Sequence, residues 1–347
     1  MSGKKPVKTM REAVLIGKRN IKIQSRPLPR PKEGEVLVRI HYCGICGSDV
    51  HVFEQGRSEP LTLGHEFSGT IAEVGPGLEG WHPGEAVAVR PSAPCGVCPW
   101  CSQGQPHLCD RSLPPQGYGT GKAPGAYADY MAVDASSLHR LPPEITIRDG
   151  AFAEPLAVVM HAVRISRFKP GDRVLVLGCG TIGLLTVHVL TQCGAGLVQA
   201  IDPIKTKRDR ALELGADHAH GPAELSRRFL DELIGQTGPD IVFECVGIPQ
   251  TLVEAFDLAP KRGQVLVLGV GMEPALFLPK IWVFKELNIQ ATFGIGREFG
   301  LALKWLAAGR VSPEAFITRE VSLEKLQETM DLLSCPNQEG KVIVRLV

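Results

Sequence analysis

The chain has 347 residues, with 38 basic and 37 acidic side chains and a formal net charge of +1. This length exceeds the size at which single hydrophobic cores stop growing, so we expect two domains. The balanced charge argues against nucleic acid or an anionic membrane surface as partner, and a small molecule is expected instead. No stretch resembles a membrane span and the start lacks the pattern of a signal peptide, so we expect a cytoplasmic protein.

The first part of the chain, residues 1 to about 145, is predicted to be rich in β-strands. Apolar and polar residues alternate at 13–16 and 36–40, and short apolar runs recur at 69–75 and 84–89 between Gly and Pro residues. This pattern is typical of short strands joined by turns. Because no helical period of useful length is found, we expect no substantial helix here.

Residue types that bind zinc gather in this first part. Cys46, His65 and Glu66 offer a thiolate, an imidazole and a carboxylate, which Zn²⁺ accepts as ligands. Ser48 and His51 follow Cys46 closely and can pass protons. Each residue alone could equally be a packing or loop residue. Together they predict half of a metal site, which needs a further ligand from elsewhere.

A second cysteine group is the most specific local pattern. Cys95, Cys98, Cys101 and Cys109 can surround one tetrahedral Zn²⁺ with no open position, which predicts a structural zinc site. Two disulfides or an iron–sulfur cluster would also use four cysteines. Zinc is favoured because the sequence shows no second redox partner and no export signal. The other cysteines outside the metal groups are expected to be small apolar residues.

From about residue 150 onward, helices alternate with strands. A helix is predicted at 152–163, and the apolar runs that follow are typical of strands buried on both faces of a parallel, doubly wound sheet. The predicted strands are 174–177, 198–201, 241–243, 265–268 and 289–293, and the predicted helices between them are 182–191, 206–214 and 223–234. After residue 296 we expect a helix at 301–308, a strand at 316–318, a helix at 323–333 and a strand at 342–347.

A glycine-rich turn indicates a dinucleotide site. Gly178, Gly180 and Gly183 follow a predicted strand, and Thr181 and Ile182 begin the next helix. The motif alone is weak evidence, because glycine-rich turns are common, but its place between a strand and a helix makes it specific. The glycines let the backbone approach a pyrophosphate, and the helix N-terminus offers N–H groups to the phosphates.

Asp202 ends the next predicted strand, where an acid that binds the cofactor ribose is expected. A carboxylate accepts hydrogen bonds from a free 2′-hydroxyl and repels a 2′-phosphate, so NAD is favoured over NADP. Lys205, Lys207 and Arg208 leave the choice open, although such charges are also typical of a solvated helix face. Among them we take Lys207 as a cofactor-binding candidate.

These motifs together resemble the zinc-dependent medium-chain dehydrogenases over nearly the whole chain. The segments that carry the resemblance are 44–51, 64–66, the four-cysteine loop, 154–158 and 178–183. The resemblance implies an α/β fold with two parts. A GroES-like, β-rich catalytic domain of residues 1–153 and 297–347, with a zinc lobe at about 94–110, would enclose a Rossmann NAD-binding domain of residues 154–296.

The resemblance also implies roles for the site residues. Cys46, His65 and Glu154 would bind the catalytic zinc, Glu66 could enter the coordination sphere, and Asp49 would lie just behind the metal. The alcohol dehydrogenase branch has a cysteine in place of Glu154, so the acid indicates the branch of sorbitol, butanediol and threonine dehydrogenases. Locally, Glu154 also fits an acid that caps the helix before the next proline.

The implied reaction is reversible transfer of hydride from a secondary alcohol, diol or polyol to NAD, which gives a ketone. Zinc would lower the pKa of the bound alcohol, and Ser48 and His51 would pass its proton to solvent, although His51 could be a plain surface histidine. The alternatives are oxidation of a 3-hydroxy amino acid, a zinc-free reductase, and a non-catalytic nucleotide-binding protein. A homotetramer or homodimer is implied by the resemblance alone.

Two departures from the sorbitol dehydrogenase pattern bear on the substrate. Val52 stands where an aromatic hydroxyl residue is expected, and Gly294 where an arginine is expected. Both changes remove polar contacts, although Arg297 and Glu298 could restore polarity from a shifted position. We therefore expect a preference for less hydroxylated alcohols over sorbitol.

Overall fold

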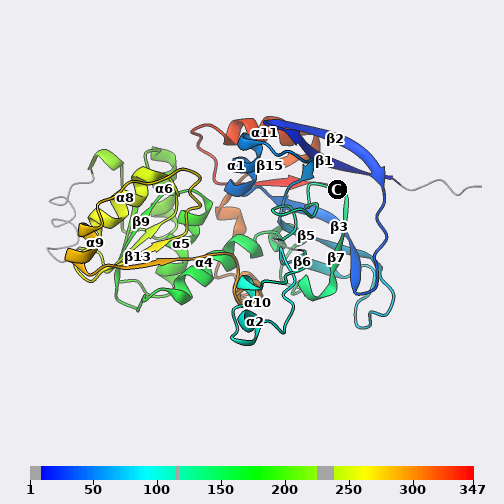
Figure 1. Cartoon of the computed structure of the whole chain (residues 1–347), viewed down its shortest axis with the longest axis horizontal. Helices are drawn as coiled ribbons and strands as arrows, with labels where there is room; N and C mark the ends of the chain where they lie inside the picture. Colours follow the sequence, from blue (N-terminus) through cyan, green and yellow to red (C-terminus); the bar gives the residue numbers. More distant parts are fainter. Residues whose placement is uncertain (1–8, 115–116, 225–237) are drawn as a thin grey trace, which may run out of the picture.

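The computed structural model describes residues 9–114, 117–224 and 238–347. In Figure 1 the N-terminal part and the middle of the chain, coloured blue to cyan and green to yellow, lie at opposite ends of the molecule, with helix α4 (Ala153–Ile165) between them. None of the described helices is long and apolar enough to cross a membrane.

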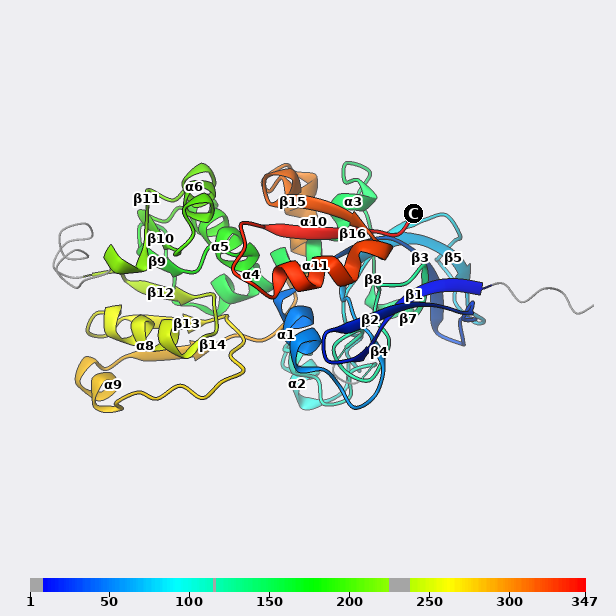
Figure 2. The same ribbon diagram turned by 90° about the horizontal axis from the view of Figure 1, so that it is seen from above.

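The first part of the chain is rich in β-strands, as expected, and its strands form two sheets. β16 (Lys341–Arg345) pairs with β3 (Glu35–Gly44) in antiparallel fashion, so the end of the chain completes the β-rich part. Figure 2 shows the red C-terminal segment beside the blue first strands. The smaller sheet has the order β2 (Asn20–Pro27), β1 (Thr9–Gly17) and β4 (Leu61–Thr62). The larger sheet has the order β15 (Ile317–Ser322), β16 (Lys341–Arg345), β3 (Glu35–Gly44), β5 (Glu66–Val74), β6 (Ala86–Val89) and β8 (Leu138–Arg140), and β7 (Tyr130–Asp134) pairs with β3.

The expectation of no substantial helix before residue 145 was wrong. Helix α1 (Gly47–Gln55) follows the first metal-ligand candidate, and α2 (Pro99–Ser102) is a single turn. A further single turn, α3 (Ile147–Gly150), comes just after this part of the chain. In α1 only Val50 and Phe53 are buried apolar residues, so the apolar repeat is too short to be detected in the sequence. Burial of Phe53 holds the helix and contributes about 1.5–3 kcal/mol.

The middle of the chain forms the predicted doubly wound sheet. All its neighbouring strands are parallel, and the order places the third, second, first, fourth, fifth and sixth strands side by side, which is the Rossmann arrangement. The strands are β11 (His218–His220), β10 (Leu197–Ile201), β9 (Arg173–Leu177), β12 (Ile241–Glu244), β13 (Gln264–Val267) and β14 (Asn288–Ala291).

The helices agree with prediction in part. α5 (Thr181–Gln192) and α6 (Lys205–Glu213) lie where expected. The helix predicted at 223–234 falls almost wholly on residues 225–237, outside the described residues. α8 (Pro249–Leu258) and α9 (Lys280–Lys285) were not predicted; α9 is short, with none of its side chains buried.

One continuous core joins the sheet to the helix between the two parts. Buried residues of β9 and α5 pack with Leu156 and Met160 of α4, and these pack with Leu303 of α10 (Phe299–Ala307). α10 thus shares the core of the nucleotide sheet, so the domain limits at 154 and 297 stay predictions. The chain then forms α11 (Leu326–Leu333), which packs with the β-rich core.

Candidate active site

Three of the predicted zinc ligands meet where β3, α1 and β5 converge. Cys46 precedes α1, His65 precedes β5, and Glu66 begins β5 opposite Gly44 of β3. The ligand atoms of Cys46, His65 and Glu66 lie within 4.8 Å of one another. The Glu66 carboxylate and the His65 imidazole are buried, whereas Cys46 is half-buried.

Asp49 organises this group from behind. Its Oδ1 lies 3.5 Å from Nδ1 of His65, and its Oδ2 accepts hydrogen bonds from the Cys46 N–H at 3.1 Å and the Tyr127 hydroxyl at 2.9 Å. Burial would raise the pKa of Asp49, but His65 and these hydrogen bonds lower it overall. An ionised Asp49 beside Nδ1 leaves Nε2 of His65 free as a ligand atom, which is the usual arrangement behind a metal-bound histidine.

Glu66 is bound by a residue that sequence reasoning missed. Lys341 donates from Nζ to Glu66 Oε2 at 2.5 Å and to the Ile45 carbonyl at 2.9 Å, and its side chain is only 3% exposed. Burial disfavours the charged lysine, yet Glu66 raises the pKa of Lys341 overall, so the ion pair persists. The one signal in the sequence was a lysine at the head of an apolar strand.

Glu154 lies in the first turn of α4, beside the group, but its carboxylate is not within 4.8 Å of all three ligand atoms. It does not cap the helix, because the N-cap is Phe152. Burial raises the pKa of Glu154 to about 7, while His65 lowers it. Among the described residues its carboxylate has no hydrogen-bond partner, although it is only 7% exposed. A buried, unpartnered carboxylate is costly unless a cation or proton reaches it.

Ser48 and His51 lie three residues apart on α1 and so share one face of the helix. Both side chains are half-buried. Nδ1 of His51 is buried and has no hydrogen-bond partner among the described residues. That arrangement is unusual for a plain surface histidine and leaves a ring nitrogen available to a ligand hydroxyl.

The residues that were expected to shape the substrate wall do not give it a polar surface. Val52 packs against the β-rich core, and Gly294 has a φ of 61°. Glu298 cannot restore a polar wall, because its carboxylate is bound by Arg164 and His161. Arg297 lies against Gly104 of the four-cysteine loop.

The glycine turn has the geometry of a phosphate site. It follows β9, and α5 begins at Thr181 with Gly180 as its N-cap. A Cβ on Gly183 would collide with the Gly178 carbonyl, so the close approach of turn and helix requires glycine. The first N–H groups of α5 have no intrahelical partners and face this turn.

Asp202 lies beside the turn, as predicted. Its Oδ2 accepts the Cys179 N–H and its Oδ1 accepts the Ile204 N–H, both at 2.8 Å, and it is 7% exposed. Each oxygen retains a second lone pair for a ligand. The acid therefore braces the turn in addition to any role toward a ribose.

The three nearby basic side chains differ in whether they already have hydrogen-bond or ion-pair partners. Lys205 pairs with Asp209 at 2.8 Å, and Arg208 donates to the Asp202 carbonyl at 2.8 Å. The side chain of Lys207 has no hydrogen-bond partner among the described residues, and only its backbone N–H is bonded, to the Ile204 carbonyl. Of the three, Lys207 alone is available to a ligand phosphate.

The four cysteines of the loop lie close enough together to hold one metal ion. The sulfur atoms of Cys95, Cys98, Cys101 and Cys109 lie within 4.8 Å of one another. The Cys101 N–H lowers the pKa of Cys98 to about 6, which favours a thiolate. All ten cysteines lie in the described ranges and are free, so the disulfide alternative does not hold.

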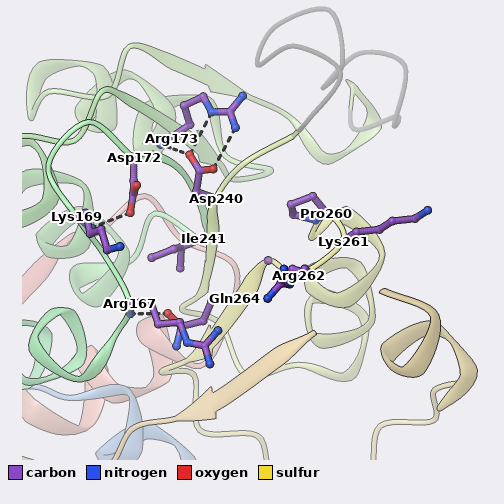
Figure 3. A pocket seen from close by; sticks show the side chains of 11 residues that line it. Arg167, Lys169, Asp172, Arg173, Asp240, Ile241, Pro260, Lys261, Arg262 and Gln264 are labelled. Atoms are coloured by element: carbon purple, nitrogen blue, oxygen red, sulfur yellow. Dashed lines mark hydrogen bonds and ion pairs between the residues drawn. The ribbon is translucent and has the colours of Figure 1, made fainter. Parts of the chain in front are cut away.

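A charged groove of about 310 Å³ lies at the amino ends of the strands of the nucleotide sheet (Figure 3). Arg173 and Asp240 at its rim form a two-fold ion pair, Nε to Oδ2 and Nη2 to Oδ1, each at 3.1 Å. β9, β12 and β13 begin here. Dinucleotides bind at the carboxyl ends of such strands, so this groove is separate from the cofactor site.

Comparisons with known proteins agree with the two-part organisation. The family model described as Alcohol dehydrogenase GroES-like domain matches residues 32–143, and the one described as Zinc-binding dehydrogenase matches residues 181–308. The chain is 34% identical to 2-dehydro-3-deoxy-L-galactonate 5-dehydrogenase of Pseudoalteromonas atlantica, covering 88% of this chain and 90% of the relative. It is 33% identical to sorbitol dehydrogenase of Gallus gallus, covering 90% of each.

Solved structures give the same result over almost the whole chain. A short chain alcohol dehydrogenase of Escherichia coli CFT073 complexed with NADH has a TM-score of 0.89 at 28% identity. A zinc-binding dehydrogenase of Sinorhizobium meliloti 1021 bound to NADP has a TM-score of 0.88 at 31% identity. Both cover 97% of this chain and 99% of the other. The chain therefore belongs to the zinc-dependent medium-chain dehydrogenases, and it is an oxidoreductase of this family with zinc and a nicotinamide dinucleotide as cofactors.

Proposed function

We propose that the chain oxidises a secondary alcohol, diol or polyol reversibly to a ketone, and that Cys46, His65 and Glu154 hold its catalytic zinc. The observation that carries the proposal is the contrast between two buried acids. Glu66 is neutralised by Lys341 at 2.5 Å, whereas Glu154 has no partner in the described part of the chain. Glu154 is thus the carboxylate available to a cation, and Glu66 would bind only when it leaves Lys341.

The residues fit zinc on the chemistry of their donors. One thiolate, one imidazole and one carboxylate, with an open position left for substrate, are typical of a catalytic zinc site. When bound there, zinc polarises the substrate hydroxyl and lowers its pKa. Asp49 orients His65, and the four cysteines of the loop would hold a second, structural zinc.

Ser48 and His51 would move the proton. Ser48, one turn before His51 on α1, would accept the proton of the substrate hydroxyl and donate its own toward the cofactor ribose. The unpartnered Nδ1 of His51 would receive it and release it to solvent. The two protein groups of this route lie on one face of α1, next to Cys46.

We propose NAD as the preferred cofactor. Asp202 would present its carboxylate to the ribose, where it would attract a 2′-hydroxyl and repel a 2′-phosphate. The single available cation, Lys207, does not outweigh a carboxylate that is fixed by two backbone N–H groups. Similar proteins occur with NADH and with NADP, so the choice rests on these side chains.

We propose a homodimer, or a tetramer built from two dimers. β14 is an edge strand, and large apolar side chains near it in sequence are exposed: Leu276 is 91% exposed, Phe284 76% and Val283 69%. An open edge beside exposed apolar residues suits pairing with a second copy. Light scattering of Phe284→Glu should give a smaller particle than the parent; an unchanged mass would exclude this surface. The cytoplasmic location stays a prediction.

A substrate panel tests the proposed function. Simple diols, cyclic alcohols, sorbitol, a sugar acid and threonine are assayed with NAD and NADP in parallel, and zinc per chain is measured on the same preparation. We expect NAD-dependent oxidation of the less hydroxylated alcohols, weak activity on sorbitol, and two zinc ions per chain. A strong preference for sorbitol would contradict the reading of Val52 and Gly294, and oxidation of threonine alone would favour the amino-acid alternative.

A further inference from the structure

Residues 295–298 return the chain from the nucleotide sheet to α10, and contacts from other elements fix this connection. Arg90 donates from Nη2 to the Ile295 carbonyl at 3.0 Å. The guanidinium of Arg297 occupies the space where a Cβ on Gly104 would stand. Both partners belong to loops of the β-rich part, so the connection is held from that side.

Glu298 is the centre of the connection. It is 3% exposed, accepts a hydrogen bond from Nε of Arg164, and lies 3.2 Å from Nδ1 of His161. A Cβ on Gly296 would stand 2.6 Å from Glu298 Oε2 and 2.7 Å from that Nδ1, so a side chain at residue 296 would displace this pair. The buried carboxylate thus ties the connection to α4.

His161 of α4 also contacts the four-cysteine loop. The rings of His161 and His107 are 4.4 Å apart at an angle of 63°, and His107 lies two residues before Cys109. The first turn of α4 carries Glu154. One series of contacts therefore runs from the loop through α4 to residues 295–298.

This cluster lies between two sites that must be aligned. Residues 292–294 follow the carboxyl end of β14, the sheet edge where dinucleotides bind, while α4 carries a residue of the metal group. The glycine turn and Asp202, which would bind the adenosine half, make no hydrogen bond or ion pair with Glu298 in the described part of the chain.

We propose that Glu298 is a positioning residue, which fixes the nucleotide sheet relative to α4 and so places the nicotinamide half of the cofactor against the metal group. It acts through Arg164 and His161 and touches none of the reacting atoms. The kinetic part of this inference rests on the proposed alcohol oxidation; the binding part does not.

The test compares the dissociation constants of NADH and ADP-ribose, because ADP-ribose lacks the nicotinamide. For Glu298→Gln we expect the constant for NADH to rise about tenfold and that for ADP-ribose to stay within about twofold of the parent. Arg164→Gln, whose side chain is 54% exposed, serves as the milder variant with the same expected pattern. The double variant should be no worse than Glu298→Gln alone, since both act in one contact.

Asp240→Asn is the matched control, because it removes an arginine–carboxylate pair at the opposite sheet edge. It should leave both constants unchanged. The proposal is overturned if Glu298→Gln binds NADH like the parent, if ADP-ribose weakens equally, or if Asp240→Asn gives the same loss. If the parent binds NADH but oxidises no alcohol, the proposed function fails while these binding results still decide the role of Glu298.

Discussion

Lys341 and Glu66 form a buried ion pair of 2.5 Å that joins the last strand to the metal group. The two residues are 275 positions apart in sequence, and both side chains are at most 3% exposed. By holding Glu66, the lysine leaves Glu154 as the one of these two buried acids that has no hydrogen-bond or ion-pair partner in the described part of the chain. The proposed choice of Glu154 as zinc ligand therefore depends on a residue that is itself no ligand.

Replacement of Lys341 by methionine should destabilise the fold by about 3–5 kcal/mol, because a buried carboxylate loses its counter-ion. Chemical denaturation measures the change. Lys325→Met, which removes an exposed pair with Glu328, should cost under about 1 kcal/mol. Equal stability of the two variants would show that Glu66 does not need Lys341.

Asp49→Asn should weaken binding of the catalytic metal by about 10–100-fold, because His65 loses the acid that orients it. Competition with a chelator measures this loss, and the four-cysteine site provides an internal control that should keep its metal. Retention of both metals at parental affinity would remove Asp49 from the site.

Cofactor choice should follow Asp202 and Lys207 in opposite directions. Asp202→Asn should lower kcat/KM with NAD and raise the relative use of NADP, whereas Lys207→Ala should reduce the use of NADP with little effect on NAD. Parallel assays with both cofactors give the ratios. An Asp202→Asn variant that keeps the parental ratio would show that this acid only braces the turn.

Glu298 should make the free energy of unfolding depend on pH. Burial would raise its pKa, but His161 and Arg164 lower the pKa to about 2. A carboxyl with a depressed pKa stabilises the fold above its unfolded pKa of about 4.3, and this contribution is lost as the pH falls toward 2. The free energy of unfolding of the parent should exceed that of Glu298→Gln by on the order of 2 kcal/mol at about pH 6, and the difference should shrink at about pH 3. A constant difference would contradict this.

The fold and the site were predicted best where the sequence contains long apolar patterns or closely spaced metal-ligand residues. Five of the six parallel strands, the glycine turn and the four-cysteine loop were located, because each depends on neighbours in the chain; β11, with three residues and none of them buried, was missed. Cys46, His65 and Glu66 meet as expected from the resemblance.

Long-range pairings were the part that could not be predicted. Lys341 reaches Glu66 only after β16 pairs with β3, and no local pattern indicates that partner. Glu298 was considered as a residue that could restore polarity to the substrate wall, but its carboxylate is instead bound by Arg164. Helix α1 was missed because only two of its nine residues, Val50 and Phe53, are buried and apolar. Packing of these two side chains against the sheet is enough to hold the helix, but it leaves no periodic pattern in the sequence.

The rate of NADH formation by folded Cys46→Ser, with the parent's best alcohol, tests the zinc-dependent reaction most directly. Loss of a zinc ligand should reduce this rate by about 1,000-fold or more, since the substrate hydroxyl is then no longer polarised. A folded variant that forms NADH as fast as the parent would contradict a reaction that depends on zinc at Cys46.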